Sequence, residues 1–116
     1  MSQRKDSLEG KTHRIKTPLG TAFIIINKQE GEFWELFINI GRAGSDLSAD
    51  SEAIGRLVSL VMQPPISDNL QRVRAIINQL ENIKGRPSNE EAKSIADAVA
   101  KVLKREVEVD KGNITL

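Results

Sequence analysis

The sequence predicts an α+β fold in which a three-stranded antiparallel meander is followed by about three helices packed on one face of the sheet. Three segments rich in β-branched and aromatic residues come first, and short polar loops separate them. Segments with apolar residues at helical spacing follow, bounded by prolines and capping residues. Strands that precede the helices in this way are typical of α+β domains rather than of alternating βαβ units.

Short loops that contain glycine or proline predict the order of the three strands. The first strand covers residues 11–17 and leads into Thr-Pro-Leu-Gly at 17–20, which has the composition of a type I turn. The second covers residues 21–27 and includes three consecutive isoleucines. The polar loop 28–32 leads to the third strand at 33–40. Because loops this short join neighbouring antiparallel strands, we expect a meander.

Apolar side chains lie on both faces of the predicted third strand. Strict alternation places Phe33 and Phe37 on one face and, on the other, Trp34, Leu36, Ile38 and Ile40. A sheet covered on one face only alternates more regularly between apolar and polar residues. We therefore expect a partner subunit or the C-terminal segment to cover part of the second face, with Phe33 and Phe37 as interface residues. The alternative is scattered surface aromatics that have no partner.

Apolar periodicity predicts the three helices. The first begins near residues 46–48 and ends at about Met62, before two prolines at 64–65. The second opens at Ser67 and Asp68 and ends before Gly85. The third opens with Ser-Asn-Glu-Glu at 88–91, a capping-box pattern. In the first helix, the residues expected to face inward are Ala53, Ile54, Leu57, Val58 and Val61.

The size of the chain predicts one domain, which we place at residues 10–104. Residues 1–9 are polar and aperiodic, so we expect a flexible N-terminal tail there. Residues 105–116 could continue the third helix, add a short strand or be disordered.

Composition excludes several classes of function. The 17 basic and 16 acidic residues give a net charge of +1, which argues against a strong non-specific nucleic-acid or membrane partner. Without cysteine, and with His13 as the single histidine, the chain offers no disulfide, no thiolate nucleophile and no multi-histidine metal site. The N-terminal residues are polar and no apolar run approaches the length of a membrane span, so we expect a cytoplasmic protein.

Four segments resemble one known module. They are residues 10–20, the block 33–60 with its Gly-Arg-Ala-Gly loop and Glu-Ala-Ile-Gly-Arg-Leu helix, residues 69–84, and Ser-Ile-Ala-Asp-Ala-Val-Ala at 94–100. Together they are similar to the TSCPD domain, the C-terminal module of adenosylcobalamin (vitamin B12)-dependent ribonucleotide reductases. The last segment resembles the Ser-Cys-Pro-Asp-Ala-Ile-Ala sequence that gives this domain its name.

This chain departs from the family at its cysteines, whose positions are taken by Leu19, Asp46, Arg86 and Ile95. In the family these cysteines look like a metal-ligand or redox-active set, so the resemblance carries neither zinc binding nor thiol chemistry to this chain. We expect the four positions still to converge. In that case packing and an Asp46–Arg86 ion pair would replace the metal.

The glycine loop before the first helix is a candidate anion site, formed by Gly41, Arg42, Gly44 and Ser45. Backbone N–H groups at a helix start attract phosphate, and Arg42 adds a positive charge. The structural alternative is a tight turn whose donors are satisfied by an internal cap.

The resemblance implies a cysteine-free, non-catalytic accessory or regulatory module of deoxyribonucleotide synthesis. Its partners would be a ribonucleotide reductase catalytic chain or a second copy in a homodimer. We expect no catalytic residues, cofactor or metal, because no nucleophile has a plausible base and the reductase chemistry needs cysteines. The alternatives are a nucleotide- or phosphate-binding sensor that uses the loop 41–45 and, less favoured, a nucleic-acid-binding regulator that uses helical arginines.

Overall fold

The computed structural model describes residues 3–63 and 69–115, and it confirms the α+β fold. Strands β1 (Glu9–Thr17), β2 (Gly20–Gln29) and β3 (Glu32–Asn39) form one antiparallel sheet in the order β1-β2-β3. Three helices follow, α1 (Asp46–Met62), α2 (Asn69–Leu80) and α3 (Ile95–Thr115). The expected start of the second helix at Ser67 and Asp68 and the two prolines at 64–65 lie outside the described residues.

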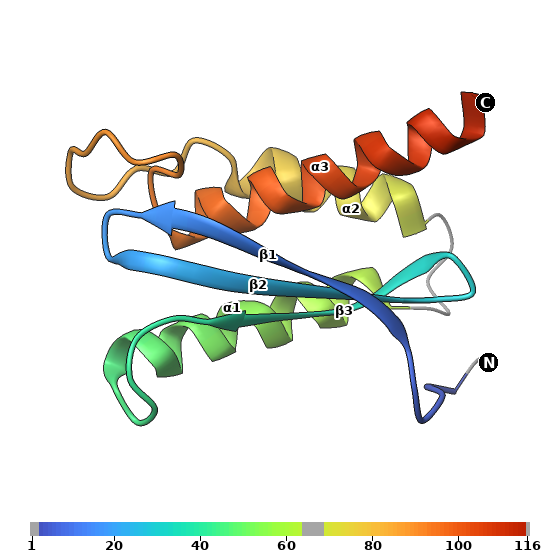
Figure 1. The fold of residues 1–116 in the computed structure, drawn as a ribbon, viewed down its shortest axis with the longest axis horizontal. Coiled ribbons are helices and arrows are strands. Elements are labelled where there is room, and N and C mark those ends of the chain that lie inside the picture. The colour runs from blue at the N-terminus through green and yellow to red at the C-terminus, as the bar shows by residue number, and fades with distance from the viewer. Residues whose placement is uncertain (1–2, 64–68, 116) are drawn as a thin grey trace.

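Helices α2 and α3 lie side by side and cover one face of the sheet, whereas α1 runs along β3 (Figure 1). The covered face presents Ile15, Ile24 and Leu36 to the core, each about 1% exposed or less. Val73 from α2 and Val99 and Leu103 from α3 complete the core and are fully buried. Because α2 and α3 bury one face only, these two helices do not cover the opposite face of the sheet.

A β-bulge changes the faces of the third strand. Asn27 pairs with Glu35 and Lys28 pairs with Phe33, so Trp34 is the extra residue on β3. Phe33 therefore turns toward the core, where it is 2% exposed, while Phe37 stays on the opposite face at 49% exposed. The two phenylalanines do not share a surface, because strict alternation stops at the bulge.

Helix α1 approaches β3 through small residues. A Cβ atom built on Gly55 would lie 3.1 Å from the carbonyl oxygen of Leu36. The hydroxyl of Ser59 accepts a hydrogen bond from the N–H of Leu36 at 2.9 Å and donates one to its carbonyl at 3.2 Å. This helix thus satisfies the backbone of Leu36 at the outer edge of the sheet.

The predicted inward residues of α1 are confirmed at Val58 and, partly buried, at Ile54, but the prediction was wrong at Ala53, Leu57 and Val61. Leu57 is 63% exposed and Val61 39%, while the buried positions of the helix are Ser51, Gly55, Val58 and Met62. The close approach between helix and strand selects the face with glycine and serine, because bulky side chains would hold the two backbones apart. Leu57, Leu60 and Val61 are left on the exposed side of the helix.

The ends of the other two helices differ from the capping pattern read from the sequence. α2 stops at Leu80, and Asn82 takes a left-handed conformation with φ of 64°. Residues 88–91 belong to the following loop, and α3 begins at Ile95 with the hydroxyl of Ser94 accepting a bond from the N–H of Asp97 at 3.0 Å. From Ile95 the helix continues to Thr115, one of the three conformations considered for the C-terminal residues. None of the described helices combines the length and apolar character needed to cross a lipid bilayer.

Candidate functional site

The uncovered side of the sheet, which we call the open sheet face, is formed by Phe23, Ile25 and Asn27 of β2 and Glu35, Phe37 and Asn39 of β3. The register makes these residues three cross-strand pairs, with Ile25 opposite Phe37 at the centre. Phe23 is 42% exposed and Phe37 49%. Two exposed aromatic side chains on adjacent strands form an apolar surface of the kind found where proteins associate.

A groove of about 490 Å³ extends this surface to α1. Its floor includes Glu35 and Phe37, and α1 contributes Arg56 and Leu60. Leu60 is 66% exposed, and Arg56 forms an ion pair of 3.0 Å with Glu52 one turn earlier in the helix. The groove is therefore lined by both apolar and polar side chains.

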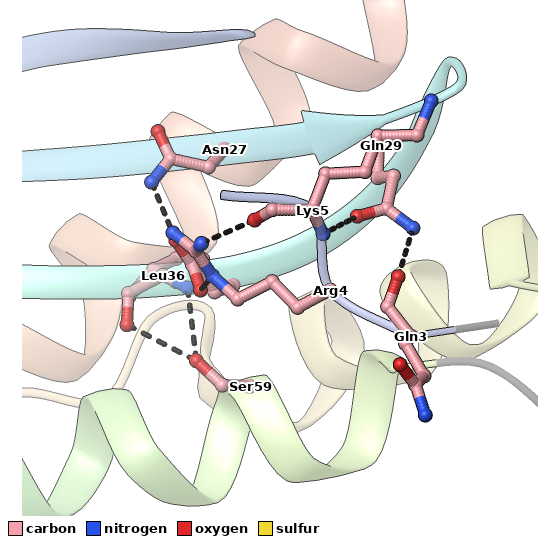
Figure 2. A network of polar contacts seen from close by, with 8 residues as sticks. Gln3, Arg4, Lys5, Asn27, Gln29, Leu36 and Ser59 are labelled. Atoms are coloured by element: carbon pink, nitrogen blue, oxygen red, sulfur yellow. Dashed lines mark hydrogen bonds and ion pairs between the residues drawn. The ribbon is translucent and has the colours of Figure 1, made fainter. Parts of the chain in front are cut away.

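An N-terminal arm, residues 3–8, lies against one end of this face. The guanidinium of Arg4 donates to both carboxylate oxygens of Glu35 at 2.9 Å, and Asn27 donates to the same carboxylate at 2.7 Å (Figure 2). Gln29 fixes the arm by accepting from the N–H of Lys5 and donating to the carbonyl of Gln3. Residues 3–5 of the segment expected to be a flexible tail are thus held by specific polar contacts.

Arg4 also lowers the pKa of the Glu35 carboxyl. Its side-chain hydrogen bonds hold the pKa of Glu35 below the usual range, against the opposing effect of burial and with a further contribution from Asn27. The carboxylate is therefore ionised at neutral pH.

The Ser and Asp of the naming motif have structural tasks in this chain. Ser94 caps α3, and its hydroxyl donates to the carbonyl of Ile83 at 2.6 Å. The fully buried carboxylate of Asp97 accepts the N–H groups of Asn82 and Lys93, both at 2.8 Å. Burial alone would raise the pKa of Asp97, but these two bonds and the nearby Lys101 ammonium hold it below its usual value. Together the two side chains tie the loop between α2 and α3 to the start of α3.

A second buried carboxylate ties α3 to the sheet. Glu106 is 3% exposed, and its oxygens lie 3.1 Å from Nε2 of His13 and within 4 Å of the ammonium groups of Lys11 and Lys28. The single histidine of the chain is thereby engaged in a contact between β1 and α3. Sequence reasoning missed this cluster because 93 residues separate His13 from Glu106.

The loop 41–45 forms a tight turn into α1. Gly41 and Gly44 have positive φ angles of 74° and 82°, which favour glycine. The hydroxyl of Ser45 accepts from the N–H of Ser48 at 3.1 Å and donates to the carbonyl of Arg42 at 2.7 Å. Because Ser45 already caps the helix, its hydroxyl has a structural partner.

The four former cysteine positions differ in their surroundings. Ile95 is 8% exposed, whereas Leu19 is 53% exposed, and Asp46 and Arg86 are also exposed. Arg86 donates to the carbonyl of Pro18 at 2.8 Å, which brings it beside Leu19. In the described part of the chain no ion pair joins Arg86 to Asp46, so the expected clip between them is not formed. No group of three or more histidine or acidic residues suited to a metal ion occurs among the described residues.

These features define a small α+β domain whose buried carboxylates hold its elements together and whose sheet keeps one apolar face exposed. The model of the TSCPD domain family matches residues 1–107, and the chain belongs to this family. The TSCPD domain is associated with the vitamin B12-dependent ribonucleotide reductases. Neither a curated protein nor a solved structure matches the chain.

Proposed function

We propose that this chain is a non-catalytic accessory module of deoxyribonucleotide synthesis that docks on the catalytic chain of an adenosylcobalamin-dependent ribonucleotide reductase. The observation that carries the proposal is the open sheet face, with Phe23 and Phe37 exposed at 42% and 49%. Membership of the TSCPD family supports the choice of partner.

The polar groups of the chain support a binding role. Asp97 fixes a loop, Glu106 fixes α3 and Glu35 holds the N-terminal arm. A carboxylate whose oxygens are already engaged by hydrogen-bond donors and cations of the same chain is poorly placed to exchange protons with a substrate. Exposed apolar side chains on a rigid sheet, by contrast, are suited to bury surface against another protein.

The test is direct binding between the purified chain and a purified adenosylcobalamin-dependent reductase catalytic chain, measured by calorimetry. Phe37→Ser removes the largest exposed side chain at the centre of the face, and we expect the affinity to fall about ten-fold or more. Ile83→Ser is the matched control, because Ile83 is similarly exposed at 45% but lies in the loop after α2. Absence of binding, or equal losses in the two variants, would contradict the proposal.

Two further measurements separate the remaining partners. Sedimentation of the chain alone tests whether it forms a homodimer. If a dimer forms and Phe37→Ser abolishes it, the partner on this face is a second copy of the chain instead of the reductase. Titration with nucleoside diphosphates tests the sensor alternative. A saturable signal lost in Arg42→Ala would assign nucleotide binding to the loop 41–45.

A further inference from the structure

The paired side chains of Asn27 and Glu35 form a receptor for one guanidinium group, which we call the guanidinium seat. Nε and Nη2 of Arg4 each lie 2.9 Å from a different oxygen of Glu35, which is the two-pronged arrangement that arginine forms with carboxylates. Asn27 donates to Oε2 at 2.7 Å and thereby orients the carboxylate. With Arg4 in place, the Glu35 side chain is 9% exposed, and the guanidinium supplies part of that cover.

The sheet supplies the seat, while its occupant comes from outside the sheet. Asn27 and Glu35 are cross-strand partners on β2 and β3, so the strand register fixes their relative position. Arg4 precedes β1, and its side chain is 44% exposed. When Arg4 is withdrawn, the Glu35 carboxylate loses its paired cation and offers both oxygens to another guanidinium group.

The seat is continuous with the apolar part of the open sheet face. Ile25 and Phe37, the next cross-strand pair on the same side, follow directly from Asn27 and Glu35. Glu35 and Phe37 line the same groove, which continues to Leu60. Side chains two residues apart on an extended chain are separated by about 6.6 Å, which matches the step from Glu35 to Phe37 along β3.

We propose that the open sheet face binds an extended partner segment that places an arginine in the guanidinium seat and, two residues away, an apolar side chain against Phe37. Arg4 is the competing internal occupant of the seat. The proposal deepens the docking function above, on which it rests for the use of this face, and it specifies the chemistry that the partner segment must carry.

The first test frees the seat by Arg4→Ala and offers a blocked pentapeptide of sequence Gly-Arg-Gly-Leu-Gly. Binding is followed by NMR through the side-chain amide of Asn27 and the ring of Phe37. We expect the peptide to bind Arg4→Ala about ten-fold or more tightly than the wild type, and the Arg4→Ala/Glu35→Gln double variant to lose that gain. The matched peptide with lysine in place of arginine should bind more weakly, because an ammonium lacks the planar fork.

Two outcomes would overturn the proposal. If Arg4→Ala does not bind the peptide, or if the double variant binds it equally well, the Arg4–Glu35 contact is a stabilising ion pair only. If Arg4→Ala does not fold, Arg4→Lys is tested instead, because it keeps a cation in the guanidinium seat. We expect Arg4→Lys to bind the peptide more tightly than the wild type does, but less tightly than a protein whose seat is empty. An affinity of Arg4→Lys equal to the wild type would also count against the proposal.

The guanidinium-seat proposal can be refuted while the proposed docking function stands. The peptide experiment contains no reductase, so its failure removes the guanidinium seat and leaves Phe37-dependent docking in place. If the peptide binds but the reductase chain does not, the seat stands and the proposed partner is wrong.

Discussion

Replacing Asp97 with alanine is the most informative perturbation of the fold. The substitution removes the acceptor of two backbone N–H groups, those of Asn82 and Lys93, at a side chain with no exposed surface. It also leaves Lys101, whose ammonium lies 3.2 Å from the carboxylate, without that partner. The loop between α2 and α3 would then lose its anchor to α3.

The expected magnitude follows from these contacts. A hydrogen bond to a charged group contributes about 1.5–3 kcal/mol, and both bonds are made to the buried Asp97 carboxylate, so losing the two destabilises the protein by about 4 kcal/mol. Lys101 adds little, because its side chain is 35% exposed and water replaces the lost contact. Domains of this size have unfolding free energies of roughly 5–15 kcal/mol, so Asp97→Ala removes a large share of the total.

Urea unfolding measures this loss, with the fluorescence of Trp34 and far-ultraviolet circular dichroism as two probes of one transition. With a urea dependence of about 2 kcal/mol per molar, the midpoint should fall by about 2 M. Lys104→Met is the control, because Lys104 is exposed on the same helix and makes no contact with Asp97, and its midpoint should change by less than about 0.5 M. An Asp97→Ala midpoint within about 0.5 M of the wild type would refute the anchoring role, and so would an equal loss in Lys104→Met.

Two further outcomes are expected for stability. Gly55→Val should destabilise the protein by about 3 kcal/mol in the same assay, because even a Cβ at this position lies 3.1 Å from the carbonyl oxygen of Leu36. Ala53→Val, on the exposed side of α1, is the control and should change the free energy of unfolding by less than about 0.5 kcal/mol. Since folding lowers the pKa of Glu35, its contribution is complete above the ordinary value of 4.5 and is lost as the pH falls through the folded value. Arg4→Ala should therefore flatten the acid side of the stability–pH curve, and an unchanged curve would contradict the assigned role of Arg4.

Local signals in the sequence were sufficient to predict the meander. Short loops dictate antiparallel neighbours, and the β-branched run of β2 marks the central strand. The bulge at Trp34 has no comparable signal, because it depends on how β2 and β3 pair. Strict alternation along the strand therefore could not predict the orientation of Phe33.

The face that α1 turns inward also depends on tertiary contacts. Apolar periodicity favours Leu57 and Val61 as core residues, whereas the helix buries Ser51 and Gly55. A close approach to a strand edge can outweigh hydrophobicity when small residues allow it. A row of serine and glycine at helical spacing is the signal that could have revealed this packing.

Of the candidate site, the sequence predicted that Phe37 lies on a second apolar face, but not the groove beside it. Arg4 lies in a polar, aperiodic segment, where nothing local distinguishes it from any other basic residue. Its role depends on Glu35, 31 positions away in the chain. Asp97 was noticed through the naming motif, yet its bonds to Asn82 and Lys93 required the structure.

The contact between Ser59 and Leu36 has a consequence for assembly. Ser59 of α1 bonds both backbone groups of Leu36 on β3, and the N–H of Ala92 bonds the carbonyl of Lys16 on β1 at 3.1 Å. Both outer strands of the sheet therefore have backbone groups already paired within the chain, which disfavours edge-to-edge addition of another molecule at these points.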